Sequence, residues 1–161
     1  MKDLQYLRQA YEEAKCLSTD PSTQNGSVLV NPIGIVIATA ANHFPYGVKE
    51  TPERWDRPLK YHYVEHAERN ALYKAARMGH KTEGATMYVP WFACADCARG
   101  IIQCGVEEVV GHQKMYDGTP DRWKESIHAA WEMLDEAGVK HRLVVADFGI
   151  KIRFNGEEWV S

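Results

Sequence analysis

Two short segments of the chain contain residue types that bind metal ions. His66-Ala67-Glu68 opens one stretch of helical spacing, and Cys94-Ala95-Asp96-Cys97 opens another. Cysteines three apart in the first turn of a helix share a face, and the positive end of the helix dipole favours the thiolate form. Zinc prefers imidazole nitrogen and thiolate, and a catalytic zinc keeps three protein ligands and one open position. We therefore predict a Zn²⁺ site formed by His66, Cys94 and Cys97.

Glu68 is the residue that we expect to do the chemistry. It lies two residues after His66, so it would not share the helical face of that ligand. In the first turn of the helix it can still reach a water molecule on the metal without binding the metal itself. A non-ligand glutamate beside His, Cys and Cys matches the described signature of zinc deaminases, in which it moves protons.

Other interpretations explain part of the same pattern. A Cys-x-x-Cys pair at a helix start is typical of thioredoxin-like redox proteins, but His66-Ala67-Glu68 would then have no role. A closed structural zinc site could use His62, four residues before His66, as a fourth ligand. That alternative gives Glu68 no role and needs a helix that begins inside a proline-containing loop. The chain would then be a non-enzymatic zinc module that binds nucleic acid or protein.

Hydrophobic periodicity indicates which elements position these residues. Residues 42–60 form a long, polar, proline-bearing stretch, and such loops are usually functional or disordered. The tail from residue 147 could add a strand or a hairpin around residues 155–156. Helices are expected over residues 2–18, 65–78, 94–104 and 120–137, and strands over 27–30, 34–40, 85–89, 107–112 and 140–146. This order predicts an α/β fold, a three-layer α/β/α sandwich with a mixed sheet of about five strands.

The bulk composition limits the domain count and the classes of partner. The 161 residues fit a single domain over 1–161, with 146–161 as a possible C-terminal extension. The net charge of −3 and the absence of a basic stripe argue against a nucleic-acid polymer as partner. No run approaches the roughly 18 apolar residues of a membrane helix, and the first residues lack a signal-peptide core. We therefore expect a cytoplasmic protein without a membrane partner.

Over roughly residues 17–146 the chain resembles the deoxycytidylate (dCMP) deaminases, a family of the cytidine deaminase-like zinc enzymes. The resemblance rests on the loop around Asn42 and on residues 18–23, 66–71, 84–89, 92–98 and 101–106. It implies a cytidine deaminase-like fold, zinc on His66, Cys94 and Cys97, and proton transfer by Glu68. The implied reaction is hydrolytic deamination of a cytosine deoxynucleotide, first of all dCMP to dUMP and ammonia.

The resemblance also suggests residues that contact the substrate. Asn42 occupies the place of an asparagine near the substrate sugar, and Arg77 matches a position implicated in substrate handling in phage enzymes. Ala67 belongs to the same motif as the zinc ligand before it, and we include it in the substrate-binding set. Tyr116 follows the fourth main strand and could line the pocket or pack in the core. Neighbouring subunits commonly complete these sites, which implies a homo-oligomer and allows a hexamer.

The identity of the substrate is less constrained than the reaction. Ala93 stands where the family usually has proline, and residues 41–44 differ from a Gly-Tyr-Asn-Gly loop that is associated with triphosphate effectors. Modified dCMP, dCTP, guanine and tRNA adenosine therefore stay open as substrates of the site. The loop over 42–60 carries Lys49, Arg54, Arg57 and Lys60. We expect part of this loop to close over a nucleotide, with Arg54 and Arg57 binding its phosphate.

Overall fold

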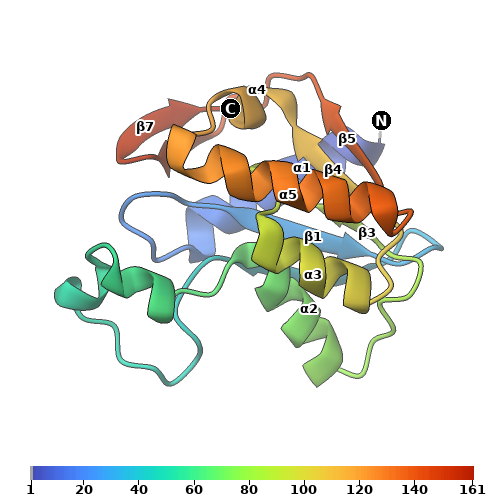
Figure 1. Cartoon of the computed structure of the whole chain (residues 1–161), viewed down its shortest axis with the longest axis horizontal. Coiled ribbons are helices and arrows are strands. Elements are labelled where there is room, and N and C mark those ends of the chain that lie inside the picture. Colours follow the sequence, from blue (N-terminus) through green and yellow to red (C-terminus); the bar gives the residue numbers. More distant parts are fainter. Residues whose placement is uncertain (1) are drawn as a thin grey trace.

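A five-stranded mixed sheet forms the centre of the computed structural model, which describes residues 2–161 (Figure 1). The strand order is β2-β1-β3-β4-β5. Strand β1 pairs antiparallel with β2 and β3, whereas β4 pairs parallel with β3 and β5. The strands are β1 (Gly26–Val30), β2 (Val36–Ala41), β3 (Thr86–Tyr88), β4 (Glu108–His112) and β5 (Lys140–Val144). The predicted mixed sheet is confirmed.

Helices cover both faces of this sheet, which confirms the three-layer α/β/α prediction. Helices α2, α3 and α5 lie in front of the sheet in Figure 1, and α1 lies behind it. A two-stranded hairpin from the C-terminal tail packs on the α1 side. The helices are α1 (Lys2–Leu17), α2 (Ala67–Arg77), α3 (Ala95–Gln103), α4 (Gln113–Asp117) and α5 (Asp121–Glu136), and the hairpin is β6 (Lys151–Phe154) and β7 (Glu157–Val160).

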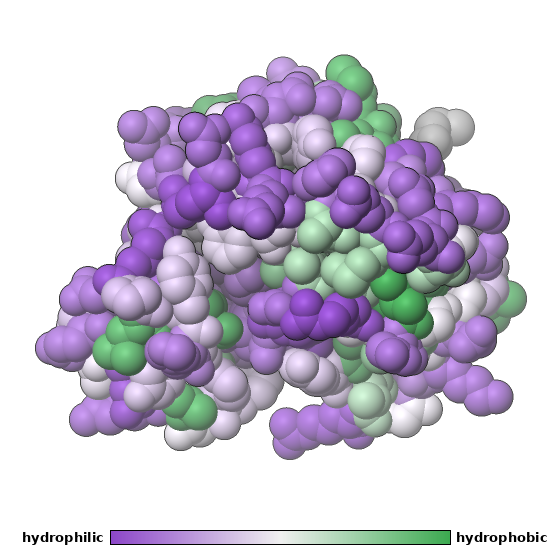
Figure 2. Space-filling model, in the orientation of Figure 1, coloured by the Kyte–Doolittle hydropathy of each residue, from purple (hydrophilic) through white to green (hydrophobic). Residues whose placement is uncertain are grey.

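The central strands are buried on both faces because successive side chains point to opposite sides. In β3, Met87 packs against the layer of α2, α3 and α5, whereas Tyr88 packs against α1. In β4, Val109 packs on the side of α2, α3 and α5, and Val110 packs on the side of α1. The view in Figure 2 is largely hydrophilic, and one of its hydrophobic areas lies over the seam between α3 and α5. Within residues 2–161 no helix is long and apolar enough to cross a membrane.

Helix α1 is tied to the parallel half of the sheet by a buried polar chain. The Tyr11 hydroxyl contacts Nδ1 of His112 at 2.6 Å, and Nε2 of the same ring is 3.0 Å from the Ala146 carbonyl oxygen. His112 at the end of β4 is fully buried. Burial lowers the pKa of His112, so the ring stays neutral, accepting from Tyr11 and donating to Ala146.

The structure differs from the sequence prediction at the start of one helix and in its short elements. Helix α2 begins at Ala67, two residues later than expected, which leaves His66 at the N-cap. The stretch over 42–60 is not entirely loop, because it contains the 3₁₀ helix η1 (Pro52–Trp55) and the beginning of η2 (Leu59–His62). Helix α4 was not expected at all. Elements of four or five residues are too short for hydrophobic periodicity to reveal them.

Candidate active site

The starts of α2 and α3 bring three metal-ligating side chains together. His66 is the N-cap residue of α2, Cys94 is the N-cap residue of α3, and Cys97 lies in the first turn of α3. Nδ1 of His66 is 3.5 Å from the sulfur of each cysteine, and all three ligand atoms lie within 4.8 Å of one another. Tetrahedral zinc at ordinary bond lengths requires ligand atoms about 3.5–3.8 Å apart. The three residues therefore fit zinc, with Nδ1 as the ligand atom of His66.

Arg69, which contacts one of these ligands, adds a positive charge beside them. Nη1 of Arg69 is 3.5 Å from the Cys97 sulfur, and the same guanidinium forms an ion pair with Glu65 one helical turn back. Both metal cysteines are buried, and both stand at the positive end of α3. A nearby guanidinium and a helix N-terminus both favour the thiolate form that a metal needs.

The pKa values reflect burial and close contact among these groups. A hydrogen bond from Cys97 lowers the pKa of Cys94 to about 4, and His66 adds to this effect. Burial raises the pKa of Cys97. Burial alone would lower the pKa of His66, but its hydrogen bond with Cys94 and the charge on that sulfur raise it. Bound zinc would hold both sulfurs as thiolates, because a coordinating thiol is deprotonated outright.

Glu68 lies beside this cluster with one oxygen atom unused. The residue is 2% exposed, and its Oε2 has no hydrogen-bond partner within residues 2–161. Burial raises the pKa of this carboxyl group. A buried carboxylate oxygen without a partner is uncommon and requires an explanation, such as a water or a ligand that it contacts. A solvent molecule and a substrate in the neighbouring cavity would satisfy it.

His62 does not complete the cluster as a fourth ligand. It is the exposed last residue of η2, and this short helix is separate from α2. Among the residues that the structure describes, the metal-binding group at this place consists of His66, Cys94 and Cys97 alone. The closed-site alternative is therefore wrong for this geometry, since three ligands leave one position of a tetrahedral zinc open.

A cavity whose empty space, open solvent included, is about 580 Å³ leads to the cluster and to Glu68. Much of its wall is aromatic: the ring of Trp123 lies 5.7–5.9 Å, centroid to centroid, from the rings of Tyr61, His66 and Trp91. Trp91 is fixed in turn, because the Asn25 amide exchanges two hydrogen bonds with its backbone. The cavity can therefore hold a flat ring against the metal.

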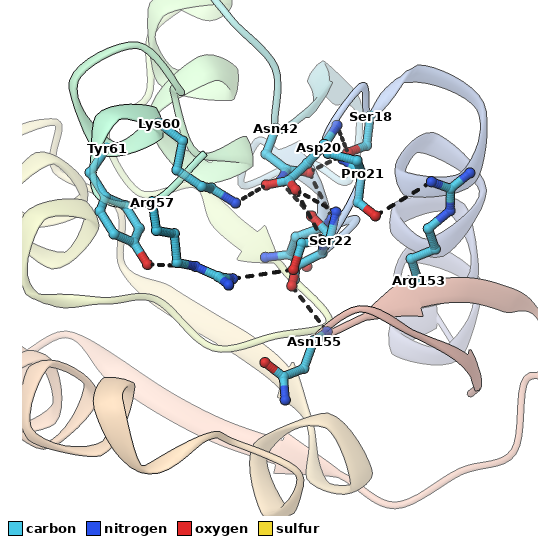
Figure 3. Close-up of polar contacts among 12 residues, drawn as sticks. Ser18, Asp20, Pro21, Ser22, Asn42, Arg57, Lys60, Tyr61, Arg153 and Asn155 are labelled. Carbon is cyan, nitrogen blue, oxygen red and sulfur yellow. Dashed lines mark hydrogen bonds and ion pairs between the residues drawn. The ribbon is translucent and has the colours of Figure 1, made fainter. Parts of the chain in front are cut away.

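A buried ion pair forms another part of the wall. Nζ of Lys60 is 2.8 Å from Oδ2 of Asp20, and both residues are 5% exposed (Figure 3). Oδ1 of Asp20 also accepts hydrogen bonds from the backbone N–H groups of Ser22 and Thr23. The carboxylate thus holds the turn after α1 against the segment that precedes α2. The resemblance drew attention to residues 18–23, but the sequence pattern did not indicate that they build this wall.

Asn42 lies in the wall, at the centre of the same network. Its Oδ1 accepts from the Ser18 hydroxyl and from the Asn25 backbone, and its Nδ2 donates to the Thr23 carbonyl and to Asp20. These contacts use both donors and both lone pairs of the amide. A hydrogen bond from Asn42 to a substrate sugar would have to replace one of them.

The other three predicted substrate residues lie in different places. Ala67 lines the cavity at the first residue of α2. Arg77 is exposed at the opposite end of that helix, eleven residues beyond the metal histidine, about 16 Å along the axis at 1.5 Å per residue. Tyr116 on α4 packs against Trp131, with ring centroids 5.2 Å apart. Neither Arg77 nor Tyr116 is part of this cavity wall.

The basic residues of the loop divide into two groups. Arg57 and Lys60 line the cavity. Arg54 does not: its Nη1 donates to the Lys49 carbonyl, and its guanidinium stacks on Tyr63 at 4.5 Å. The expected pairing of Arg54 with Arg57 on a phosphate is therefore not what the structure shows. Its contacts with Lys49 and Tyr63 hold Arg54 outside the cavity wall.

Sequence reasoning missed two cavity residues at the start of α5, Arg122 and Trp123. The topology contained a signal for them. Strands β3 and β4 are parallel, so their carboxyl ends meet at one edge of the sheet, where ligands bind in open α/β folds. The metal cysteines follow β3, and residues 113–123 follow β4. The segment after β4 therefore lies at the edge of the sheet where site residues are expected.

Comparison with known proteins agrees with this geometry. Residues 1–113 match the family described as the cytidine and deoxycytidylate deaminase zinc-binding region. A deoxycytidylate deaminase of Mus musculus is 33% identical over 144 residues, which cover 81% of this chain and 77% of the mouse protein. An uncharacterised deaminase from the luxG 3′ region of Aliivibrio fischeri is 37% identical over 123 residues, covering 76% of this chain and 80% of that protein.

Solved structures of related fold confirm the architecture. The dCMP deaminase of cyanophage S-TIM5, crystallised with dCMP and dUMP, superposes with a TM-score of 0.68 and 23% identity, covering 88% of this chain and 95% of that one. A bifunctional deaminase and reductase from Thermotoga maritima, which acts on a diaminohydroxyphosphoribosylaminopyrimidine, gives a TM-score of 0.61 at 26% identity. That match covers 87% of this chain and 35% of the other. The fold is therefore cytidine deaminase-like.

Proposed function

This chain belongs to the family of cytidine and deoxycytidylate deaminases, and we propose that it converts dCMP and water to dUMP and ammonia. The observation that carries the proposal is the three-ligand cluster with the unpartnered Oε2 of Glu68 beside it. Three ligands leave a metal open to water, and a buried carboxylate that does not bind the metal can move protons.

Glu68 performs the proton transfers in this reaction. His66, Cys94 and Cys97 would hold zinc, which would supply a nucleophile near neutral pH by lowering the pKa of a water molecule to about 7. Glu68 accepts a proton from the water as its oxygen forms a bond to C4 of the ring. The carboxyl group passes that proton to N3, takes up the remaining hydroxyl proton and delivers it to the amino group. The C4–N bond then breaks, and ammonia leaves.

The cavity wall suits a pyrimidine ring. Trp123, Tyr61 and Trp91 provide flat apolar surfaces next to the metal ligands. Ala67 places its backbone N–H at the start of α2, where the first N–H groups of a helix have no intrahelical partner. That donor is available for the exocyclic oxygen of the base. These walls orient the ring so that C4 meets the nucleophile.

dCMP is the leading substrate among the members of this reaction class. The deoxycytidylate deaminases of mouse and human are 33% and 32% identical to this chain over most of its length. The mouth of the cavity carries cations that suit a single phosphate, and the chain as a whole is acidic. A local cluster of positive charge favours a small nucleotide over a nucleic-acid polymer.

A substrate panel tests this proposal directly. Ammonia release from the zinc-loaded protein should give the highest kcat/KM with dCMP, compared with cytosine, cytidine, CMP, dCTP, 5-substituted dCMP, guanine and a tRNA anticodon stem. The variant Glu68→Gln should retain its zinc and lose about 10²- to 10⁴-fold in kcat, the usual contribution of a general acid–base. Metal content measured on the same samples separates loss of catalysis from loss of the site.

Each arm of the panel has an outcome that contradicts the proposal. Zinc binding without ammonia release from any compound would indicate a structural zinc module. A higher kcat/KM for guanine or for tRNA adenosine would leave the deaminase chemistry in place and make dCMP the wrong substrate. Full activity of Glu68→Gln would remove Glu68 from the mechanism.

A further inference from the structure

Two arginines that line the cavity carry charge that no acidic residue balances in the part of the chain that the structure describes. Arg57 precedes η2, and Arg122 lies in the first turn of α5. Within residues 2–161 neither forms an ion pair with a carboxylate, whereas Lys60, the third cation of the cavity, is neutralised by Asp20 at 2.8 Å. Two uncompensated guanidinium groups match the charge of a phosphate dianion.

Both guanidinium groups are held by neutral hydrogen-bond partners. Nε of Arg57 donates to the Tyr61 hydroxyl at 3.0 Å, and its Nη2 donates to the Ser22 hydroxyl at 3.2 Å. Nη2 of Arg122 donates to Oδ1 of Asn155 at 2.8 Å. Neutral partners fix the direction of an arginine and leave its charge available to an anion.

Asn155 reaches this place from the turn of the β6–β7 hairpin. Its φ of 53° lies in the left-handed region, which asparagine tolerates better than most residues, and Gly156 follows at 87°. The backbone N–H of Asn155 donates to the Thr23 hydroxyl, and that of Gly156 donates to the Ser22 carbonyl. The side chain that contacts Arg122 is therefore carried by a turn with a defined position.

Arg57 and the C-terminal hairpin meet on one loop, and the hairpin also carries the partner of Arg122. Figure 3 shows Arg57 and Asn155 both approaching the loop that contains Ser22, and Asn155 in turn binds Arg122. The ring of Phe154 on the hairpin packs against Trp91 of the cavity wall, with centroids 5.1 Å apart. The C-terminal hairpin thus supports residues of the cavity wall from outside the cavity.

We propose that Arg57 and Arg122 bind the 5′-phosphate of the nucleotide substrate, and that Asn155 on the C-terminal hairpin is the positioning residue that orients Arg122. The inference rests on the proposed function, because it assigns the phosphate of that substrate. Arg122 and Asn155 both lie beyond residues 1–113, which match the family. The tail therefore contributes to the preference for a nucleotide over a nucleoside through the contact of Asn155 with Arg122.

Kinetics with dCMP and deoxycytidine on the zinc-loaded full chain test the assignment. Arg122→Ala should raise KM for dCMP about 10- to 100-fold, the usual effect of losing a hydrogen bond to a charged group, and change kcat/KM for deoxycytidine less than about twofold. Asn155→Gly removes the side-chain oxygen that accepts the hydrogen bond from Arg122, and glycine tolerates the positive φ at this position. This variant should therefore raise KM for dCMP by a smaller factor. Arg153→Ala is the matched control, since it removes a cation from the same hairpin but not from the cavity wall.

A double variant separates positioning from general structural damage. If Asn155 acts through Arg122, the variant carrying Arg122→Ala and Asn155→Gly should have the KM of Arg122→Ala alone, because coupled residues are not additive. If the increase in KM of the double variant is instead the product of the increases of the two single variants, the positioning role of Asn155 is wrong. Equal losses with dCMP and deoxycytidine would overturn the phosphate assignment.

Calorimetric binding keeps the assignment testable if the proposed reaction fails. The Glu68→Gln protein should bind dCMP at least tenfold more tightly than deoxycytidine, and the double variant Arg57→Ala, Arg122→Ala in that background should abolish the difference. Equal binding of the two compounds, or binding of neither, contradicts the phosphate site. Absence of turnover by the wild type alongside phosphate-dependent binding would contradict only the proposed reaction.

Discussion

Single residues in this protein combine a structural task with a place in the site, and the Asp20–Lys60 pair shows how. Both groups are almost fully buried, so each relies on the other for compensation of its charge. Removal of one partner from a buried pair is costly because the remaining charge is left in a poorly solvating environment. The same pair fixes the turn whose Ser22 hydroxyl receives Arg57.

Lys60→Met should therefore destabilise the fold strongly. We expect the free energy of unfolding in urea to fall by about 3–5 kcal/mol, since Asp20 loses its only ion-pair partner in the part of the chain that is described. Lys140→Met is a matched control, because the Lys140–Glu107 pair is exposed and should contribute little to stability. The double variant Asp20→Asn, Lys60→Met should recover part of the loss, and equal costs for the two single lysine variants would contradict this account.

At the scale of elements, the position of α1 on the sheet depends on a close backbone approach. A Cβ on Gly26 in β1 would lie 2.0 Å from the carbonyl oxygen of Ala10 and 2.8 Å from the backbone nitrogen of Ala14. Both contacts are with the backbone of α1, so no flexible side chain can move aside. Glycine at this position lets the helix pack tightly against the first strand of the sheet.

Gly26→Ala should push α1 away from β1 and lower the melting temperature. Overpacking of a well-packed interface costs about 1–3 kcal/mol or more, and 1 kcal/mol corresponds to about 2–4 °C in a chain of this size. Gly100→Ala in α3 serves as the control, because its Cβ would meet Leu72 Cδ1 at an ordinary 3.5 Å and alanine favours the helix. If the two variants melt at the same temperature, the close approach is not a constraint.

For the whole molecule, the metal site couples two helices that leave the sheet at the same edge. His66 begins α2, the two cysteines begin α3, and Trp123 of α5 packs on the His66 ring. A ligand that binds only the folded state raises its stability by mass action. Zinc should thus stabilise the complete α2–α3–α5 layer as well as the site itself.

Removal of zinc by a chelator should lower the melting temperature by roughly 10 °C, and added Zn²⁺ should restore it whereas Mg²⁺ should not. The size follows from about 4 kcal/mol for a ligand present at a thousand times its dissociation constant. Mg²⁺ prefers oxygen ligands and does not suit a His and Cys set. Loss of zinc, measured by elemental analysis, without any change in melting would show that the cluster contributes nothing to the fold.

Local spacing along the chain was enough to predict several parts of this protein. The Cys94-x-x-Cys97 pair, the histidine that begins the preceding helix and Glu68 could be identified from their positions at helix starts. The alternation of helices and strands likewise predicted the three-layer fold and its mixed sheet. Periodicity and capping are properties of neighbouring residues, so a single chain contains them in full.

The residues that complete the site from distant parts of the chain could be found only in the folded protein. Arg122 and Asn155 are 33 positions apart, and Asp20 and Lys60 are 40 apart, yet each pair is in hydrogen-bond contact. The fold also placed Arg54, Arg77 and Tyr116 outside the cavity wall and packed the C-terminal hairpin against Thr23 and Trp91 of that wall. Such contacts arise from the packing of whole elements against one another, and the spacing of residues along the chain does not encode the distance between two elements.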